Sequence, residues 1–231
     1  MPEHPEPGEG PGSKTEGIAA RTRRLFARGS SADRIAYYSD AVFAIAMTLL
    51  VLDLKIPDGS TSALQVLQEE WQSYVAFMLS FVIIAYSWMS HHRRFKYVIG
   101  YDSGLLVVNL ILLFFVVSLP FPTALVSRFA PETSAVVVYA AAVALLELAE
   151  LAEWIYLKRR GLLSSEIDSG VFWYVFWDFL PAIVVFGGSI VIAFLADGSA
   201  AMYSWFAMLV VAPIAGILIG RRIDRAARMP R

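Results

Sequence analysis

Several polar side chains of this sequence lie inside or at the ends of long apolar segments. Asp40 is near the start of one such segment, His91 is at the end of the next, and Asn109 lies within a third. An ionised carboxylate is costly in a lipid bilayer unless a partner compensates its charge. Arg34, at the start of the first segment, carries a positive charge that can compensate the carboxylate. We therefore predict a buried polar cluster of Asp40, Arg34, His91 and Asn109 that holds the first helix in place.

A second group of carboxylates lies in two later apolar segments. Glu147, Glu150 and Glu153 recur every three residues, and Asp178 follows in the next segment. Intramembrane carboxylates often serve as proton relays. Taken by themselves, Glu147 and Asp178 therefore favour a proton-coupled cation transporter or a proton-permeable pore. For Glu150 and Glu153 we predict positions at the membrane interface, near Lys158.

Neither a metal site nor an enzyme active site is predicted. His91 and His92 are adjacent and so point away from each other on a helix, and the chain has no cysteine. Ser39 and Asp40 are also adjacent, and their side chains diverge by about 100°, which argues against a catalytic triad with His91. We expect no enzymatic activity, no cofactor and no tightly bound metal ion.

The chain that positions these residues is much more apolar than a soluble domain. Of its 231 residues, 58% are hydrophobic and 17% are charged, whereas soluble domains have about half and about a quarter. This composition excludes an ordinary cytosolic α/β enzyme. A helix crosses a bilayer core with about 20 apolar residues. The predicted fold is therefore an all-α integral membrane protein with six transmembrane helices, at residues 36–56, 71–90, 103–127, 133–157, 169–196 and 198–220.

Basic residues predict the orientation of these helices. If both termini are cytoplasmic, 17 of the 19 Lys and Arg residues lie on the cytoplasmic side, and only Lys55 and Arg128 lie on the outer side of the membrane. This distribution agrees with the excess of positive charge in cytoplasmic loops. We predict a multi-pass protein of the plasma (inner) membrane, with residues 34–222 as its transmembrane domain. Residues 1–33 are predicted to be a disordered, basic cytoplasmic tail, and 223–231 a basic tail. The arginines of residues 21–34 favour contact with anionic membrane lipid, and we expect no nucleic-acid partner.

The first apolar segment is predicted to form a helix with two faces. Ile45, Thr48, Leu49 and Leu52 follow helical spacing and form an aliphatic stripe with one hydroxyl group. Asp40 lies about 140° from Ile45 around the helix axis, on the other face. Taken alone, an aliphatic stripe is most often a packing surface.

Together these residues resemble the signature of the transmembrane protein 175 family of potassium channels. The first motif resembles the family pattern R-xxx-F-S-D, with Tyr38 in place of the usual Phe. The resemblance covers residues 34 to 123 and is carried by Arg34-xxx-Tyr38-Ser39-Asp40, Trp88-xx-His91-xxx-Phe95, Asn109-Leu110 and Leu119-Pro120-Phe121-Pro122-Thr123.

The resemblance implies a potassium-selective, passively conducting homotetramer in which the first helix of each subunit lines a central pore. It places the narrowest constriction, a hydrophobic gate, at Ile45. Leu49 and Leu52 would form further aliphatic layers, and Thr48 a ring of hydroxyl groups. The family has no carbonyl filter of the TVGYG type, and this chain has no such sequence. The resemblance also implies a structural polar network outside the ion path, formed by Arg34, Ser39, Asp40, Trp88, His91 and Asn109.

Overall fold

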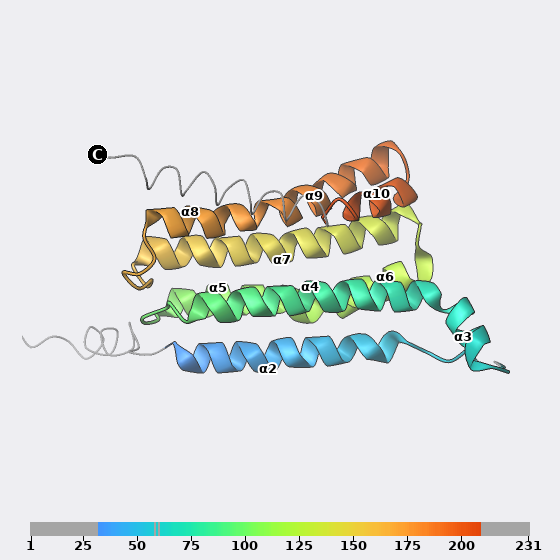
Figure 1. Cartoon of the computed structure of the whole chain (residues 1–231), viewed down its shortest axis with the longest axis horizontal. Helices are drawn as coiled ribbons and strands as arrows, with labels where there is room; N and C mark the ends of the chain where they lie inside the picture. The colour runs from blue at the N-terminus through green and yellow to red at the C-terminus, as the bar shows by residue number, and fades with distance from the viewer. Residues whose placement is uncertain (1–31, 58, 60, 209–231) are drawn as a thin grey trace, which may run out of the picture.

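The computed structural model describes residues 32–57, 59 and 61–208. Within this part, every regular element is a helix, apart from one isolated antiparallel bridge between Val98 and Leu163 (Figure 1). The predicted all-α fold is confirmed. Five helical segments of the described part are long and apolar enough to cross a membrane: Asp33–Asp53, Trp71–Phe95, Ser103–Phe129, Thr133–Arg160 and Ser169–Leu195.

The sixth predicted span and the tails lie largely outside the described residues. Residues 198–220 begin as helix α10 (Gly198–Trp205), which Asp197 caps by accepting a hydrogen bond from the backbone N–H of Ala200. The part of this span beyond residue 208, residues 1–31 and residues 223–231 are not described.

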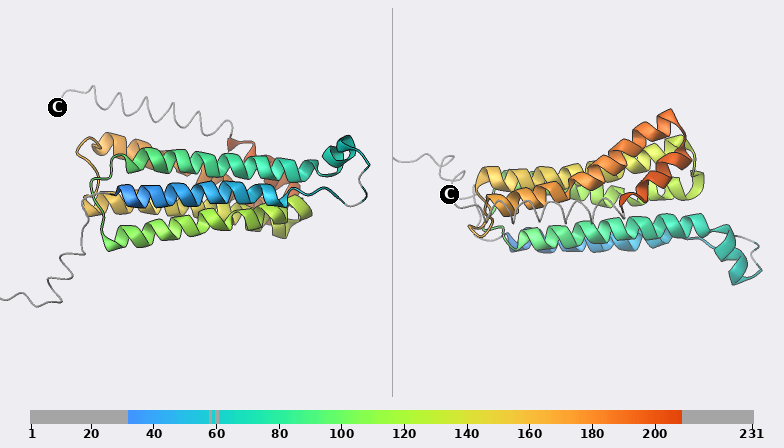
Figure 2. Two further views of the ribbon diagram at one scale, coloured as in Figure 1. Left: turned by 90° about the horizontal axis from the view of Figure 1, so that it is seen from below. Right: turned by 45° about the horizontal axis from the view of Figure 1, so that its top comes forward.

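The first span consists of α2 (Asp33–Leu50) and a 3-10 turn, η1 (Val51–Asp53). It buries one face against α4 (Trp71–Phe95) and α5 (Ser103–Ser118), which lie on either side of it (Figure 2). The buried positions recur every three or four residues, as expected for an amphipathic helix: Ile35, Ser39, Phe43, Ala46 and Leu50.

Two of the spans are interrupted near a proline. The third span divides at Leu119 into α5 and α6 (Pro120–Phe129), and the fifth divides at Phe179 into α8 (Ser169–Asp178) and α9 (Leu180–Leu195). Proline lacks an amide hydrogen and its ring crowds the preceding turn, so it fits the first turn of a new helix better than a helix interior. One short helix, α3 (Ala63–Glu69), was not predicted; Ser62 caps it by accepting a hydrogen bond from Gln65 N–H.

Helix α7 (Thr133–Arg160) forms the centre of the bundle. It packs against α5, α6, α9 and α10 and buries residues along most of its length, whereas α2 lies at the edge farthest from α8 and α9 (Figure 1). The connection from α4 to α5 and that from α7 to α8 lie at the same end of the bundle as the start of α2. Two backbone hydrogen bonds join these connections, from Ile99 N–H to Leu162 O (2.9 Å) and from Ser164 N–H to Tyr97 O (2.8 Å).

Asp102 forms a polar cluster beside these connections. Its carboxylate caps α5 by accepting from Leu105 N–H (2.8 Å), and it also accepts from the Tyr156 hydroxyl (2.7 Å) and the Arg160 guanidinium (2.9 Å). Burial by itself raises the pKa of Asp102, but the hydrogen bonds from Tyr156, Leu105 and Arg160 outweigh it and hold the pKa below its usual range. The ionised carboxylate thus links the start of α5 to the end of α7.

Candidate pore surface and buried polar network

The face of α2 that does not pack on the bundle is a continuous exposed stripe. Ile45, Leu49 and Leu52 are 56%, 39% and 68% exposed, and Thr48 is exposed between them. The two faces predicted from helical spacing are therefore present in the structure. We call the face formed by Ile45, Thr48, Leu49 and Leu52 the α2 stripe.

Thr48 places a hydroxyl group within the α2 stripe. Its hydroxyl donates a hydrogen bond to the backbone carbonyl of Ile45, one turn earlier, at 2.8 Å. The hydrogen is therefore directed toward the helix backbone, while the oxygen keeps its lone pairs for another partner. Such an oxygen can accept a hydrogen bond from water or contact a cation.

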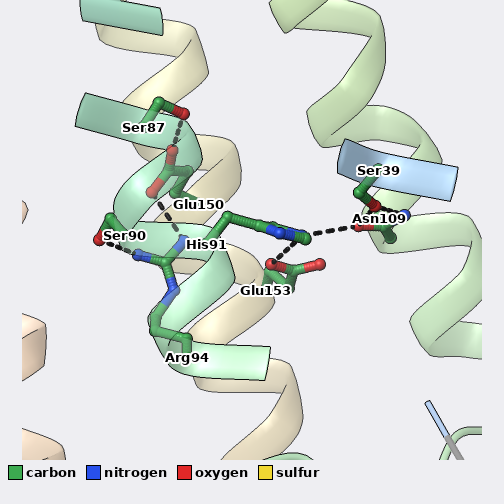
Figure 3. A network of polar contacts seen from close by, with 8 residues as sticks. All are labelled: Ser39, Ser87, Ser90, His91, Arg94, Asn109, Glu150 and Glu153. Atoms are coloured by element: carbon green, nitrogen blue, oxygen red, sulfur yellow. Dashed lines mark hydrogen bonds and ion pairs between the residues drawn. The ribbon is translucent and has the colours of Figure 1, made fainter. Parts of the chain in front are cut away.

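The opposite face of α2 is held by a buried hydrogen-bonded chain (Figure 3). Ser39 and the side-chain amide of Asn109, on α5, lie within 3.1–3.2 Å of each other. The Asn109 carbonyl oxygen lies 3.2 Å from Nε2 of His91, on α4. The His91 ring also stacks on Phe95, with 4.2 Å between the ring centroids. Three helices are thus connected by buried polar atoms behind the α2 stripe.

Asp40 and Arg34 are not part of this chain. Asp40 accepts a hydrogen bond from Nε1 of Trp88 at 2.8 Å and lies 3.8 Å from Nδ1 of His92. Arg34 is exposed and makes no side-chain hydrogen bond or ion pair within the described residues. It follows the same helical face as Tyr38 and the α2 stripe, so it points away from the other three residues. The predicted single cluster is therefore divided.

The glutamates of α7 occupy a different position from the one predicted. Glu150 and Glu153 are 1% and 0% exposed, so the expectation that they reach the membrane interface is wrong. Arg94 lies inside the bundle, and its guanidinium forms an ion pair with Glu150 at 2.7 Å. Glu150 also accepts from the hydroxyl of Ser87, and Arg94 donates to the Ser90 hydroxyl at 2.6 Å (Figure 3).

Sequence reasoning missed Arg94, Ser87 and Ser90. Arg94 stands beside Arg93 at the end of an apolar segment, a position typical of a basic residue in a cytoplasmic loop. The signal that could have found it is the recurrence of polar residues at positions 87, 90, 91 and 94, which places them on one face of a helix.

Glu147 and Asp178 lie in different surroundings. Glu147 is buried on α7, whereas Asp178 is exposed on the single chain and accepts a hydrogen bond from the Tyr86 hydroxyl at 3.1 Å. The two carboxyl groups therefore do not form one buried site within the single chain. Residue 178 ends α8, and its side chain points away from the interior of the chain.

The fold and this site define a class: a multi-pass, all-α membrane protein whose first span buries a polar face and leaves an aliphatic face uncovered. The model of the family described as "Endosomal/lysosomal potassium channel TMEM175" matches residues 34–120. A potassium channel of Streptomyces collinus is 38% identical over 143 residues, covering 59% of this chain and 69% of that relative. The chain belongs to the TMEM175 family, and the resemblance seen in its motifs is confirmed.

Another relative and a solved structure support this assignment. A potassium channel of Chamaesiphon minutus is 43% identical over 107 residues, which cover 43% of this chain and 51% of the relative. The crystal structure of a TMEM175 homolog from Chamaesiphon minutus, described as a lysosomal potassium-selective channel homolog, superposes with a TM-score of 0.65 at 26% identity. The match covers 81% of this chain and 97% of that one.

Proposed function

We propose that this chain is the subunit of a homotetrameric potassium channel in which α2 of each subunit faces a central pore. The observation that carries the proposal is the α2 stripe, an uncovered face on a helix whose other face is fully packed. Membrane lipid could also cover an aliphatic stripe. The Thr48 hydroxyl within the stripe and the Arg34 charge on the same face favour a wet surface instead.

The proposed mechanism depends on hydration. A ring of Ile45 side chains would form a neck narrow enough to remove water from a passing ion and so act as a hydrophobic gate. Potassium gives up hydration water less reluctantly than sodium because its charge is spread over a larger radius. Leu49 and Leu52 would extend the apolar lining, and the Thr48 oxygen would offer a polar contact between them.

We also propose that the channel lies in the plasma membrane with both termini cytoplasmic. The connections from α4 to α5 and from α7 to α8 lie at one end of the bundle together with the start of α2. Exposed basic side chains gather near this end, as expected for a cytoplasmic side: Arg93, Lys96, Lys158, Arg159 and Arg160.

Ion flux from liposomes tests the channel proposal directly. Purified protein is reconstituted, and potassium and sodium flux are compared without a proton gradient. We expect passive potassium flux that exceeds sodium flux. Equal movement of the two ions would contradict selectivity, and an absence of passive flux would contradict a channel.

The lining role of the α2 stripe has its own test, because the chain contains no cysteine. Thr48→Cys would place a thiol in the pore, whereas Ala46→Cys would place it on the buried face, where Ala46 is 0% exposed. We expect a water-soluble thiol reagent to block flux through the Thr48 variant and to leave the Ala46 variant conducting. The reverse pattern would remove the α2 stripe from the ion path.

The alternative is a proton-coupled cation transporter or a proton-permeable pore, and the buried carboxylate of Glu147 is the observation that favours it. Potassium movement that requires an opposing proton gradient would support the transporter. Glu147→Gln should then abolish the coupling, whereas a channel should keep its passive potassium flux in this variant.

A further inference from the structure

Glu153 is a buried carboxyl group that has no hydrogen-bond partner among the residues the structure describes. It is 0% exposed, and neither of its oxygens makes a hydrogen bond within the described residues. Two nitrogen atoms across the same helix interface, Nδ1 of His91 and Nε of Arg94, also have no hydrogen-bond partner there. Four buried polar atoms without hydrogen-bond partners in the described part of the chain thus lie between α4 and α7.

The charges around Glu153 do not balance. Arg94 is committed to Glu150, with its Nη2 at 2.7 Å from the carboxylate. The remaining basic group is His91, whose Nε2 lies 3.8 Å from Glu153 and which forms an ion pair only when it is protonated. An unpaired carboxylate is costly in such surroundings, and a bound proton removes its charge.

Among the residues that the structure describes, no other helix supplies a free cation to Glu153. On α7 itself, the neighbouring titratable groups Glu147 and Glu150 are carboxyl groups and supply no cation. The titratable groups that neighbouring helices bring to this region are engaged with one another or lie on other faces: Asp40 of α2 with His92 of α4, Tyr86 of α4 with Asp178 of α8, and Asp102 before α5 with Tyr156 and Arg160.

We propose that Glu153 is a proton-binding site, and that its protonation is transmitted to α2 through His91, Asn109 and Ser39. A proton from solution binds one carboxylate oxygen and no other bond is formed or broken. Ionised Glu153 attracts the hydrogen on Nε2 of the His91 ring toward α7, in competition with the carbonyl oxygen of Asn109. Neutral Glu153 removes that attraction, so the position of His91 is then set by its contact with Asn109 (Figure 3).

The transmission follows from the way in which α2 is held. Asn109 contacts both His91 and Ser39, and Ser39 is fully buried on the packed face of α2. A displacement of the His91 ring therefore alters the polar contact that fixes the back of the helix carrying the α2 stripe. Since the stripe is the proposed pore lining, this second part of the inference rests on the proposed function.

The test is the pH dependence of potassium flux in liposomes. Wild-type protein is compared with Glu153→Gln, which keeps the shape of the side chain and cannot ionise. The control is Glu166→Gln, because Glu166 is exposed in the α7–α8 connection. We expect wild-type and control flux to change about fivefold or more between about pH 5 and about pH 8. We expect flux through Glu153→Gln to stay constant. A wild-type pH profile in Glu153→Gln would overturn the coupling to α2.

Infrared difference spectroscopy tests the proton site without ion flux. We expect the carboxylic-acid C=O band of the wild-type protein to lose one component in Glu153→Gln and to keep it in Glu166→Gln. An unchanged band in Glu153→Gln would overturn the proton site. If Glu153→Gln does not fold, Glu153→Asp replaces it. We then expect a shift in the frequency of the C=O band and in the pH midpoint of potassium flux. Unchanged values of both would again overturn the proposal. Absence of wild-type flux at every pH would defeat the channel function and leave the infrared result standing.

Discussion

Arg94 and Glu150 form a buried ion pair between α4 and α7, and both members are nearly inaccessible to solvent. Removing two charges from water is unfavourable, and their mutual attraction compensates only when the geometry is good and other hydrogen bonds are satisfied. Ser87 and Ser90 provide such bonds here. At the residue scale, the stability of the bundle therefore depends on each charge keeping its partner.

Arg94→Met should lower the free energy of unfolding by about 3–5 kcal/mol, because it leaves the Glu150 carboxylate buried without a cation. The double variant Arg94→Met with Glu150→Gln should recover much of that loss, since the unpaired charge is then absent. Unfolding in detergent micelles, followed by tryptophan fluorescence, measures both. The loss in the free energy of unfolding is also measured for Glu150→Gln alone. If the loss in the double variant equalled the sum of the losses in the two single variants, the two residues would not be coupled.

Ile45→Asn should lower the ratio of potassium to sodium flux toward one. The amide side chain is polar and would let water into the neck that an isoleucine ring keeps dry. The measurement is parallel potassium and sodium flux from liposomes, with Leu52→Asn as the matched control at the end of the α2 stripe. An unchanged ratio in the Ile45 variant would remove this residue from the selective constriction.

At the element scale, Asp102 joins the start of α5 to the end of α7 while its carboxylate is ionised. Its folded pKa is lowered, so the ionised group stabilises the fold above the unfolded pKa of about 3.9. That contribution is lost as the pH falls through the folded value. Acid should therefore loosen this end of the bundle by protonating Asp102.

Asp102→Asn keeps an oxygen for the helix cap but removes the charge. We expect it to be less stable than the wild type by about 1 kcal/mol near neutral pH, because hydrogen bonds to a charged group are stronger than those to a neutral group. The difference should shrink as the pH falls below about 4. Thermal unfolding across this pH range measures the effect. The control is Asp168→Asn. Asp168 caps α8 by accepting one hydrogen bond from the backbone N–H of Val171, so this substitution should lower the stability less.

The positions of the five spans in the described residues could be predicted from the sequence because hydrophobic length is a local property. The two interruptions follow from Pro120 and Pro181, which are visible in the sequence. Helix α3 was missed because its seven residues are too few to show a periodic pattern. The burial of Glu150 and Glu153 could not be predicted, because it depends on which face of α7 meets α4, a property of tertiary packing.

The candidate site shows the same division between features set by local sequence and features set by tertiary packing. The α2 stripe could be predicted from spacing along one helix. The contact of Ser39 with Asn109, and the separation of Asp40 from both, depend on how three helices are rotated against one another. The family resemblance supplied roles for these residues that periodicity alone did not.

At the scale of the whole molecule, the single chain leaves a face of α2 uncovered, and the proposed tetramer gives this face a function. The contact between Asp40 and Trp88 fixes the rotation of α2 against α4. A helix turned about its axis would present different side chains to neighbouring subunits. Assembly is therefore expected to depend on this contact.

Asp40→Leu should reduce the fraction of tetramer, because it leaves the Trp88 indole N–H without its acceptor, at a cost of about 1–3 kcal/mol. Asp40→Asn keeps an acceptor oxygen and should assemble more nearly like the wild type. Size-exclusion chromatography with light scattering measures the oligomer in detergent. Normal tetramer from Asp40→Leu would show that this contact does not guide assembly.

The polar anchors of α2 are confined to its first half. Ser39 and Asp40 are fixed by directional hydrogen bonds, whereas the buried positions of the second half, Ala46 and Leu50, are packed among apolar side chains. Aliphatic packing tolerates exchanges that conserve volume, but a hydrogen bond requires a particular chemical group. Natural variation along this helix should therefore be unequal, with residue type restricted around Ser39 and only residue size restricted around Leu50.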